Sequence, residues 1–127
     1  FLSMAALTST AHADNFQAGL TAAKKKDYAT AFTNWIPLAK NGHAIAQYNL
    51  AQMYRRGQGV AVSYAKALYW YRKSANQGYA SAQLNLGNMY YYGYGVTKNY
   101  ATAKIWYVKA AAQGNKNARH NLKLIKP

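Results

Sequence analysis

The sequence contains no cysteine and no glutamate, and only two aspartates and two prolines occur in its 127 residues. Without cysteine the chain has no disulfide, no thiol nucleophile and no thiolate metal ligand. Both acids, Asp14 and Asp27, lie near the start of the chain, so residues 28–127 carry no negative side chain. No apolar run reaches the roughly 20 residues that a membrane-spanning helix needs. The absences exclude a disulfide-stabilised domain and give no support to a transmembrane segment.

Positive charge is the counterpart of the missing acids. Lysine and arginine together number 16 against 2 acids, which gives a formal net charge of +14 at pH 7. Such a surface attracts anions and repels cations, although net charge says little about fold. The alternative is a chain that became basic for solubility alone, but an average surface mixes both signs. We therefore expect the charge to select the partner.

The first thirteen residues resemble the rear of a secretory signal. Phe1 to Leu7 is a short apolar run, and Ala11-His12-Ala13 has the small-x-small form of a signal-peptidase site. The alternative is a plain N-terminal tail. We interpret residues 1–13 as a signal-peptide remnant cleaved after Ala13, which predicts a periplasmic or secreted protein that starts at Asp14. A location outside the cytosol argues against nucleic acid as the partner.

The chain repeats itself with a period of 36 residues. Residues 44–79 align without a gap with residues 80–115, and about half of the aligned positions are identical. Weaker matches extend upstream and downstream. We therefore predict one domain over residues 14–127, made of a partial unit (14–43), two repeats (44–79 and 80–115) and a C-terminal capping helix (116–127). Repeats of this length stack on one another, because none buries its apolar face alone.

Each repeat has the pattern of two helices. In the first, Ala46, Leu50 and Met53 fall on one helical stripe; in the second, Ala67, Trp70, Tyr71 and Ser74 do the same. The glycine-rich segment 57–59 separates the two, and its counterpart is 93–95. Asp14 and Asp27 are expected at helix starts. The pattern predicts an all-α fold with about seven helices.

The repeated motif A-x-x-x-L-x-x-M-Y-x-x-G-x-G-V, followed by A-x-x-W-Y, resembles the Sel-one-like repeat family. The residues that carry this resemblance are 46–78 and 82–114. It implies a tetratricopeptide-like α/α solenoid of antiparallel helix pairs, in which the first helices line the concave surface. Where the family usually has Asp before the second helix, this chain has Asp27, Ser63 and Asn99, all of which can cap a helix.

Catalysis has little support in the sequence. Acid–base chemistry needs a tunable carboxylate or histidine beside a second polar group, and both acids are expected to cap helices. We expect His43 and His120 to be solvated. No cluster of three or four metal ligands is present. The two G-x-G segments recur at the repeat period and are interpreted as turns, so we predict no enzyme, no metal and no cofactor.

Positions that differ between the two repeats suggest a binding surface. On the first helices these positions form a second stripe, turned away from the stripe that the repeats share. Tyrosine and arginine are typical anchors of protein interfaces. We name this predicted partner-binding surface the variable patch; the alternative is an ordinary solvated face. It consists of Tyr48, Gln52, Arg55, Arg56, Leu84, Asn88, Tyr91 and Tyr92.

Three functions follow, in descending order of support. The first is a monomeric adaptor, inhibitor or immunity-type protein that binds an acidic protein partner. The second is a binder of an anionic envelope glycan or lipid surface, where tyrosines stack on sugars and lysines meet phosphates. A hydrolase is the third, and the absence of glutamate and cysteine disfavours it.

Overall fold

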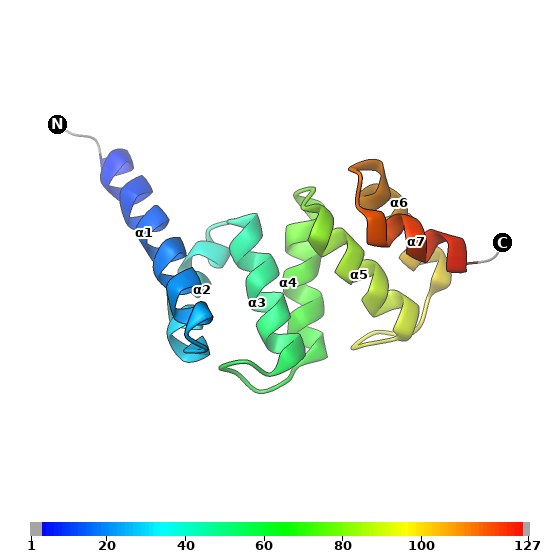
Figure 1. Cartoon of the computed structure of the whole chain (residues 1–127), viewed down its shortest axis with the longest axis horizontal. Coiled ribbons are helices and arrows are strands. Elements are labelled where there is room, and N and C mark those ends of the chain that lie inside the picture. Colours follow the sequence, from blue (N-terminus) through cyan, green and yellow to red (C-terminus); the bar gives the residue numbers. More distant parts are fainter. Residues whose placement is uncertain (1–3, 126–127) are drawn as a thin grey trace.

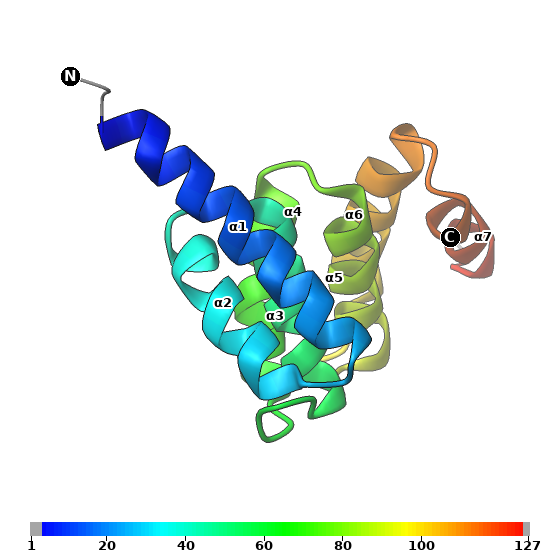
Figure 2. The ribbon, with the colours of Figure 1, turned by 60° about the vertical axis from the view of Figure 1, so that its left-hand side comes forward.

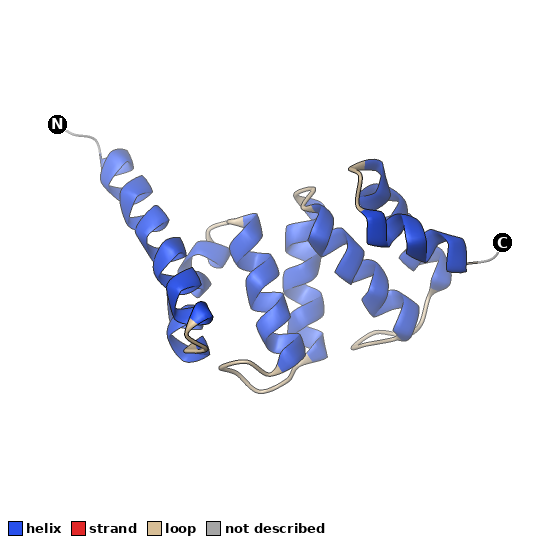
Figure 3. Ribbon diagram, in the orientation of Figure 1, coloured by secondary structure: helices blue, strands red, loops and turns tan. Residues whose placement is uncertain are grey.

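The computed structural model describes residues 4–125, with side chains described from residue 14 onward, and this part of the chain contains seven α-helices and no strand (Figures 1 and 3). The prediction of an all-α fold with about seven helices is therefore confirmed. The helices are α1 (Met4–Lys24), α2 (Tyr28–Lys40), α3 (Ala44–Arg56), α4 (Tyr64–Asn76), α5 (Ala80–Tyr92), α6 (Tyr100–Ala112) and α7 (Lys116–Leu124).

Consecutive helices run antiparallel and pack side by side along the molecule (Figure 1). The odd-numbered helices form one layer and the even-numbered helices lie behind them, which Figure 2 shows from another side. Each helix packs mainly on the helices next to it in the chain. This is a solenoid of helix pairs in which α3 and α5 belong to the same layer.

Two expectations near the N-terminus were wrong. Asp14 was expected to start a helix, but α1 already begins at Met4, so Asp14 lies inside that helix. Of the predicted signal segment, residues 1–3 lie outside the described part and residues 4–13 continue α1. His43 was expected to be solvated; it is half-buried instead, and its ring stacks on Phe16 at 4.9 Å between centroids. Its Nδ1 atom accepts the Ala46 N–H at 3.1 Å, so His43 caps α3.

The start of each second helix is capped as predicted. The Asp27 carboxylate, the Ser63 hydroxyl and the Asn99 amide oxygen each accept a backbone N–H three residues later, at 3.3, 3.2 and 3.0 Å respectively. In both full repeats a neutral side chain therefore caps the second helix, as the Asp27 carboxylate does in the first unit. Capping of these helices does not require negative charge.

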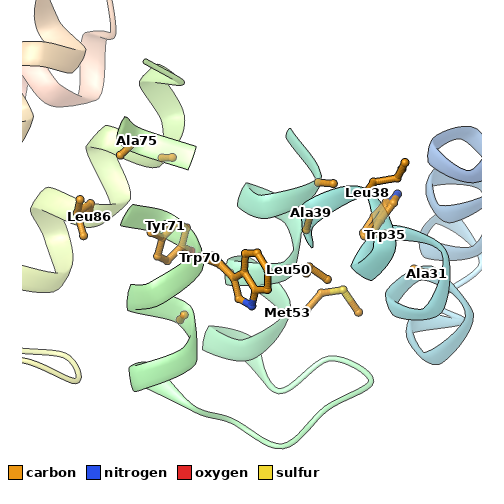
Figure 4. Close-up of a cluster of buried hydrophobic side chains, with 14 of the residues drawn as sticks. Ala31, Trp35, Leu38, Ala39, Leu50, Met53, Trp70, Tyr71, Ala75 and Leu86 are labelled. Atoms are coloured by element: carbon orange, nitrogen blue, oxygen red, sulfur yellow. The ribbon is translucent and has the colours of Figure 1, made fainter. Parts of the chain in front are cut away.

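The core follows the repeated stripes. Ala46, Leu50 and Met53 on α3 are buried, as are Trp70 and Tyr71 on α4 (Figure 4). Their counterparts on α5 and α6 are buried as well, except that Trp106 is only partly covered. Small residues in the stripes let the helices approach closely, and large side chains fill the spaces beside them.

Paired glutamines join one helix pair to the next. Gln47 is buried; its amide nitrogen donates to the Ala39 carbonyl at 3.0 Å, and its oxygen accepts from Gln77 at 2.8 Å. Gln77 also donates to the Gly42 carbonyl. One period later, Gln83 and Gln113 make the same set of bonds. Because both glutamines in each pair are satisfied, the junction is held by polar groups without any charge.

The second glycine of each G-x-G segment packs against the preceding unit. A Cβ atom added to Gly59 would lie 2.7 Å from the carbonyl carbon of Tyr28, and one added to Gly95 would lie 2.8 Å from that of Tyr64. Both glycines also have positive φ. The turn segments predicted from the sequence therefore also form the contact that fixes the spacing between units.

Replacement of Gly95 by alanine should destabilise the protein more than replacement of Gly78. Both positions have positive φ, which costs an alanine about 1–2 kcal/mol, but a Cβ at Gly78 meets no atom within 4 Å. We expect Gly78→Ala to cost only that amount, and Gly95→Ala to cost about 3 kcal/mol or more because backbone atoms must also move. Urea unfolding measures the difference, and equal losses would contradict the proposed contact.

Candidate partner-binding surface

The variable patch divides into two groups on neighbouring helices of one layer. Its first four residues lie on α3 and its last four on α5. Arg56 and Tyr92 are exposed, Tyr92 to 52%, and the other six side chains are half-buried. The sequence thus brings eight residues to one side of the solenoid, but only two of them extend fully into solvent.

A hydrogen-bond network organises the α3 group. The Arg55 Nε atom donates to the Tyr71 hydroxyl at 3.1 Å, and Arg55 Nη2 donates to the Gln52 Oε1 atom at 3.0 Å. The Tyr71 hydroxyl in turn donates to the same Gln52 oxygen. The Gln52 Nε2 atom donates to the Tyr48 hydroxyl at 2.8 Å. Three of the four predicted α3 residues therefore form one unit with a core tyrosine.

Burial makes the tyrosines of this network harder to ionise. Desolvation raises the pKa of Tyr71 to about 12, although the nearby Arg55 opposes this shift. Desolvation also raises the pKa of Tyr48, with a further contribution from Tyr79. Both phenols are protonated at neutral pH; the Tyr71 hydroxyl donates to Gln52, while the Tyr48 oxygen accepts from it.

A hollow of about 240 Å³ lies beside the α3 group, between α1, α2 and α3. Its apolar lining includes Trp35 and Met53, and its polar lining includes Tyr48, Gln52 and Arg56. The other lining residues are Ala23, Tyr28, Asn49 and Gln58. The hollow therefore combines an apolar base with donor groups and a cation, and none of its lining residues is acidic.

The α5 group has a similar network without a charge. The Tyr107 hydroxyl donates to the Asn88 Oδ1 atom at 2.6 Å, and Asn121 Nδ2 donates to the same oxygen at 3.2 Å. Desolvation raises the pKa of Tyr107 to about 12. Tyr91 and Leu84 pack against the buried cluster around Tyr107. The position that carries the guanidinium in the first repeat is thus a partly packed ring in the second.

The structure adds a row of tyrosines that the sequence did not reveal. The rings of Tyr64, Tyr94, Tyr92, Tyr91 and Tyr100 follow one another at centroid distances of 5.2, 5.5, 4.9 and 5.1 Å. Four of the five rings are exposed. We name these five residues the tyrosine row. It connects the exposed end of the variable patch to the starts of α4 and α6.

Tyr71 and Tyr79 are two further residues that the variable patch omitted. Tyr71 belongs to the shared core stripe, so a comparison of the two repeats removes it from the candidates. Tyr79 contacts the Tyr48 ring at 5.2 Å. The sequence could have indicated Tyr71, because the hydroxyl of a core tyrosine needs a hydrogen-bond partner and is therefore expected at the edge of the core.

Other cations lie on the second helices, where they cover aromatic rings. Lys73 lies 5.0 Å from the centroid of Tyr69, and Lys109 lies 4.7 Å from that of Trp106. These contacts place a positive charge over an exposed ring at Tyr69 and over a half-buried ring at Trp106. Arg72 on α4 donates one hydrogen bond to the Tyr90 hydroxyl at 2.6 Å, whereas Arg55 in the α3 group is held by two bonds, to Tyr71 and Gln52.

Neither a metal site nor a membrane span is found in the described residues. Within this part of the chain no three His, Asp or Glu side chains come together as metal ligands. A search of the same residues for a helix both long and apolar enough to cross a bilayer was negative.

A family model described as Sel1 repeat matches residues 44–79 and 80–115. Among solved structures, a Sel1 repeat protein from Oxalobacter formigenes is 36% identical with a TM-score of 0.79; the match covers 82% of this chain and 43% of that protein. The protein c5321, a protective antigen present in uropathogenic Escherichia coli strains that displays an SLR fold, is 37% identical with a TM-score of 0.81. That match covers 84% of this chain and 24% of c5321.

Helicobacter pylori cysteine rich protein B has the same fold, with a TM-score of 0.71 at 21% identity over 87% of this chain and 94% of its own. This chain spans less than half the length of the first two structures. No curated protein sequence matches this chain.

Alkaline pH should destabilise the fold through its two buried tyrosines. The pKa of Tyr71 and of Tyr107 is raised to about 12 from the ordinary value of 10.0. Above pH 10 the unfolded chain releases these protons while the folded chain keeps them, so the unfolding free energy falls as the pH rises toward 12. The loss for Tyr71 amounts to about 3 kcal/mol at most. Urea unfolding at several pH values measures it; Tyr71→Phe should reduce the slope, and an unfolding free energy that stays constant would refute the assignment.

Proposed function

This chain belongs to the Sel1 repeat family, and we propose that it is an exported protein-binding module that takes an acidic protein partner on its variable patch. Sel1 repeat proteins are in general protein-interaction modules. The finer proposal rests mainly on one observation: no acidic residue follows Asp27, while Arg55 and Arg56 lie together on α3.

Charge supports an acidic partner. A net charge of +14 attracts a negative protein over about one Debye length, close to 10 Å in 0.1 M salt. Such attraction speeds association and disfavours basic partners. The neutral caps on α4 and α6 show that the fold keeps its helix starts without the carboxylates that would weaken this field.

The arrangement of the exposed tyrosines supports a protein partner rather than a sugar polymer. In the tyrosine row, Tyr64, Tyr94 and Tyr92 stack on one another with interplanar angles of 28° and 25°. Each stacked ring covers part of a face of its neighbour, which leaves less open ring face for a sugar. Tyrosine and arginine together are the side chains that anchor protein interfaces. An anionic glycan or lipid surface is the second candidate, favoured only by the net charge.

An inhibitor, an adaptor and an immunity protein all use such a surface. Each masks or recruits a partner by stoichiometric binding and needs no catalytic group. Export is supported by the signal-like segment 1–13. One of the similar proteins is described as a protective antigen, which is compatible with a location outside the cytosol.

Loss of Arg56 and Tyr92 should reduce partner capture. Both side chains are exposed, so the double variant Arg56→Ala/Tyr92→Ala removes one cation and one ring without opening the core. The matched control is Lys73→Ala/Tyr69→Ala on α4, which removes the same two kinds of group from another face. Capture of a stoichiometric protein from an envelope extract should fall at least about tenfold in the first variant only.

Salt completes this test. Capture by the unchanged protein should weaken between about 0.05 and 0.5 M salt, because screening shortens the range of its field. Equal capture by both double variants would contradict the proposed surface. Retention by purified anionic lipid or glycan in place of a protein would favour the second candidate.

Cleavage after Ala13 predicts a defined mature N-terminus. Expression of the chain behind a complete bacterial signal start should give a periplasmic product whose first residue is Asp14. Intact-mass measurement and N-terminal sequencing check this outcome, and Ala11→Asp/Ala13→Asp is the control because signal peptidase requires small residues there. A product that keeps residues 1–13 would contradict the proposed signal.

A further inference from the structure

We propose that the α3 group is a carboxylate-binding site, which receives one Asp or Glu side chain of the partner between Tyr48 and Arg55. The inference rests on the proposed function and specifies its chemistry.

The network fixes the orientation of the Gln52 amide. Its oxygen accepts from both Tyr71 and Arg55, so its nitrogen must point toward Tyr48. Arg55 carries only donors, and the Tyr71 oxygen already accepts from Arg55 Nε, so a flipped amide would turn its nitrogen toward another donor. The amide is therefore held in one orientation by two donors on the same side.

This orientation leaves the Tyr48 hydrogen available. The Tyr48 oxygen accepts from Gln52 Nε2 at 2.8 Å, so its own O–H points elsewhere, and among residues 14–125 it meets no acceptor. Tyr48 also lines the hollow between α1, α2 and α3. A neutral hydroxyl donor is thus directed outward from the network.

Arg55 supplies the positive charge at the other end of the same amide. Its Nε and one Nη2 hydrogen are bound to Tyr71 and Gln52, so three of its five N–H donors have no partner in the described part of the chain. The two acids of the sequence, Asp14 and Asp27, line a different hollow with Thr21 and Lys25. The guanidinium is therefore held in place without a counter-ion.

The geometry matches a carboxylate. The outward donors of Tyr48 and Arg55 lie on either side of one carboxamide, so an acceptor with two oxygens can meet both. Charge-assisted bonds of this kind are shorter and stronger than neutral ones. The apolar base of the adjacent hollow, at Trp35 and Met53, can take the aliphatic part of a glutamate. Arg56 at the rim adds a second positive charge.

The second repeat lacks these features at the same positions. Leu84 replaces Tyr48, and Tyr91 replaces Arg55, while Asn88 accepts from Tyr107 and Asn121. The core tyrosine and its amide partner are kept, but no cation remains, and Leu84 has no hydroxyl at the position of Tyr48. The second repeat is therefore an internal control for the first.

The test uses Gln52→Glu against Asn88→Asp in the full chain. A glutamate at position 52 would accept from Arg55 and Tyr71 with one oxygen and from the Tyr48 hydroxyl with the other, so it would occupy the outward hydroxyl and give Arg55 a counter-ion. Asn88→Asp makes the same change in net charge at the equivalent position. With a decaglutamate peptide as the probe, calorimetry in about 0.15 M salt should show a loss of tenfold or more for Gln52→Glu only. Its melting temperature should not fall.

Tyr48→Phe gives a second, milder variant. It removes the outward hydroxyl and keeps the ring against Tyr71 and Tyr79, and we expect a loss of about fivefold in peptide affinity. Butyrate should perturb the side-chain NMR signals of Gln52 and Arg55 more strongly than inorganic phosphate at equal ionic strength. A larger effect of phosphate would overturn the assignment to a carboxylate.

The outcomes separate this site from the proposed function. If the Gln52→Glu and Asn88→Asp variants bind the peptide equally well, the proposed carboxylate-binding site is wrong, while an acidic partner remains supported. If the unchanged protein does not bind decaglutamate, the carboxylate-binding site is also overturned. The proposed function is then tested independently by capture of a protein from the envelope extract.

Discussion

The spacing between units depends on a contact that only glycine permits. Gly59 and Gly95 place the backbone of a turn against the first residue of the second helix in the preceding pair, where a Cβ would lie within 3 Å of backbone atoms. This contact repeats every 36 residues, so each first helix takes the same place in the solenoid as the one before it. Equivalent positions of α3 and α5 consequently fall in one layer. The variable patch exists as a surface because of this regularity.

The core tyrosines connect the buried core to the proposed binding surface. Tyr71 and Tyr107 are buried, yet each hydroxyl must find a partner, and each finds an amide on the first helix of its own repeat. The core therefore dictates a polar side chain at positions 52 and 88. The fold does not determine the residues around that amide, and the two repeats differ there. The network of the first repeat contains the charged Arg55, and that of the second repeat is neutral.

The fold could be predicted from sequence because its determinants are local and repeated. The helical stripes, the capping residues and the glycine turns all recur at one offset. The surface was harder to predict, since a comparison of repeats detects only positions that differ. It found Arg55 and Gln52, but it removed Tyr71, which is common to both repeats and orients them. The tyrosine row joins residues from three segments, and His43 caps a helix through a ring nitrogen; neither follows from helical spacing.

The missing acids also carry an energetic consequence. A net charge of +14 on a small solenoid favours expansion through self-repulsion. In the two full repeats the caps of the second helices and the glutamine junctions are built from neutral groups, so the fold itself does not explain why carboxylates are absent there. A guanidinium held between Tyr71 and Gln52 without a counter-ion adds to the cost. An acidic partner would relieve both, and a ligand that binds only the folded state stabilises it in proportion to its concentration and affinity. The proposed acidic partner would thus account for a charge that the fold itself does not need.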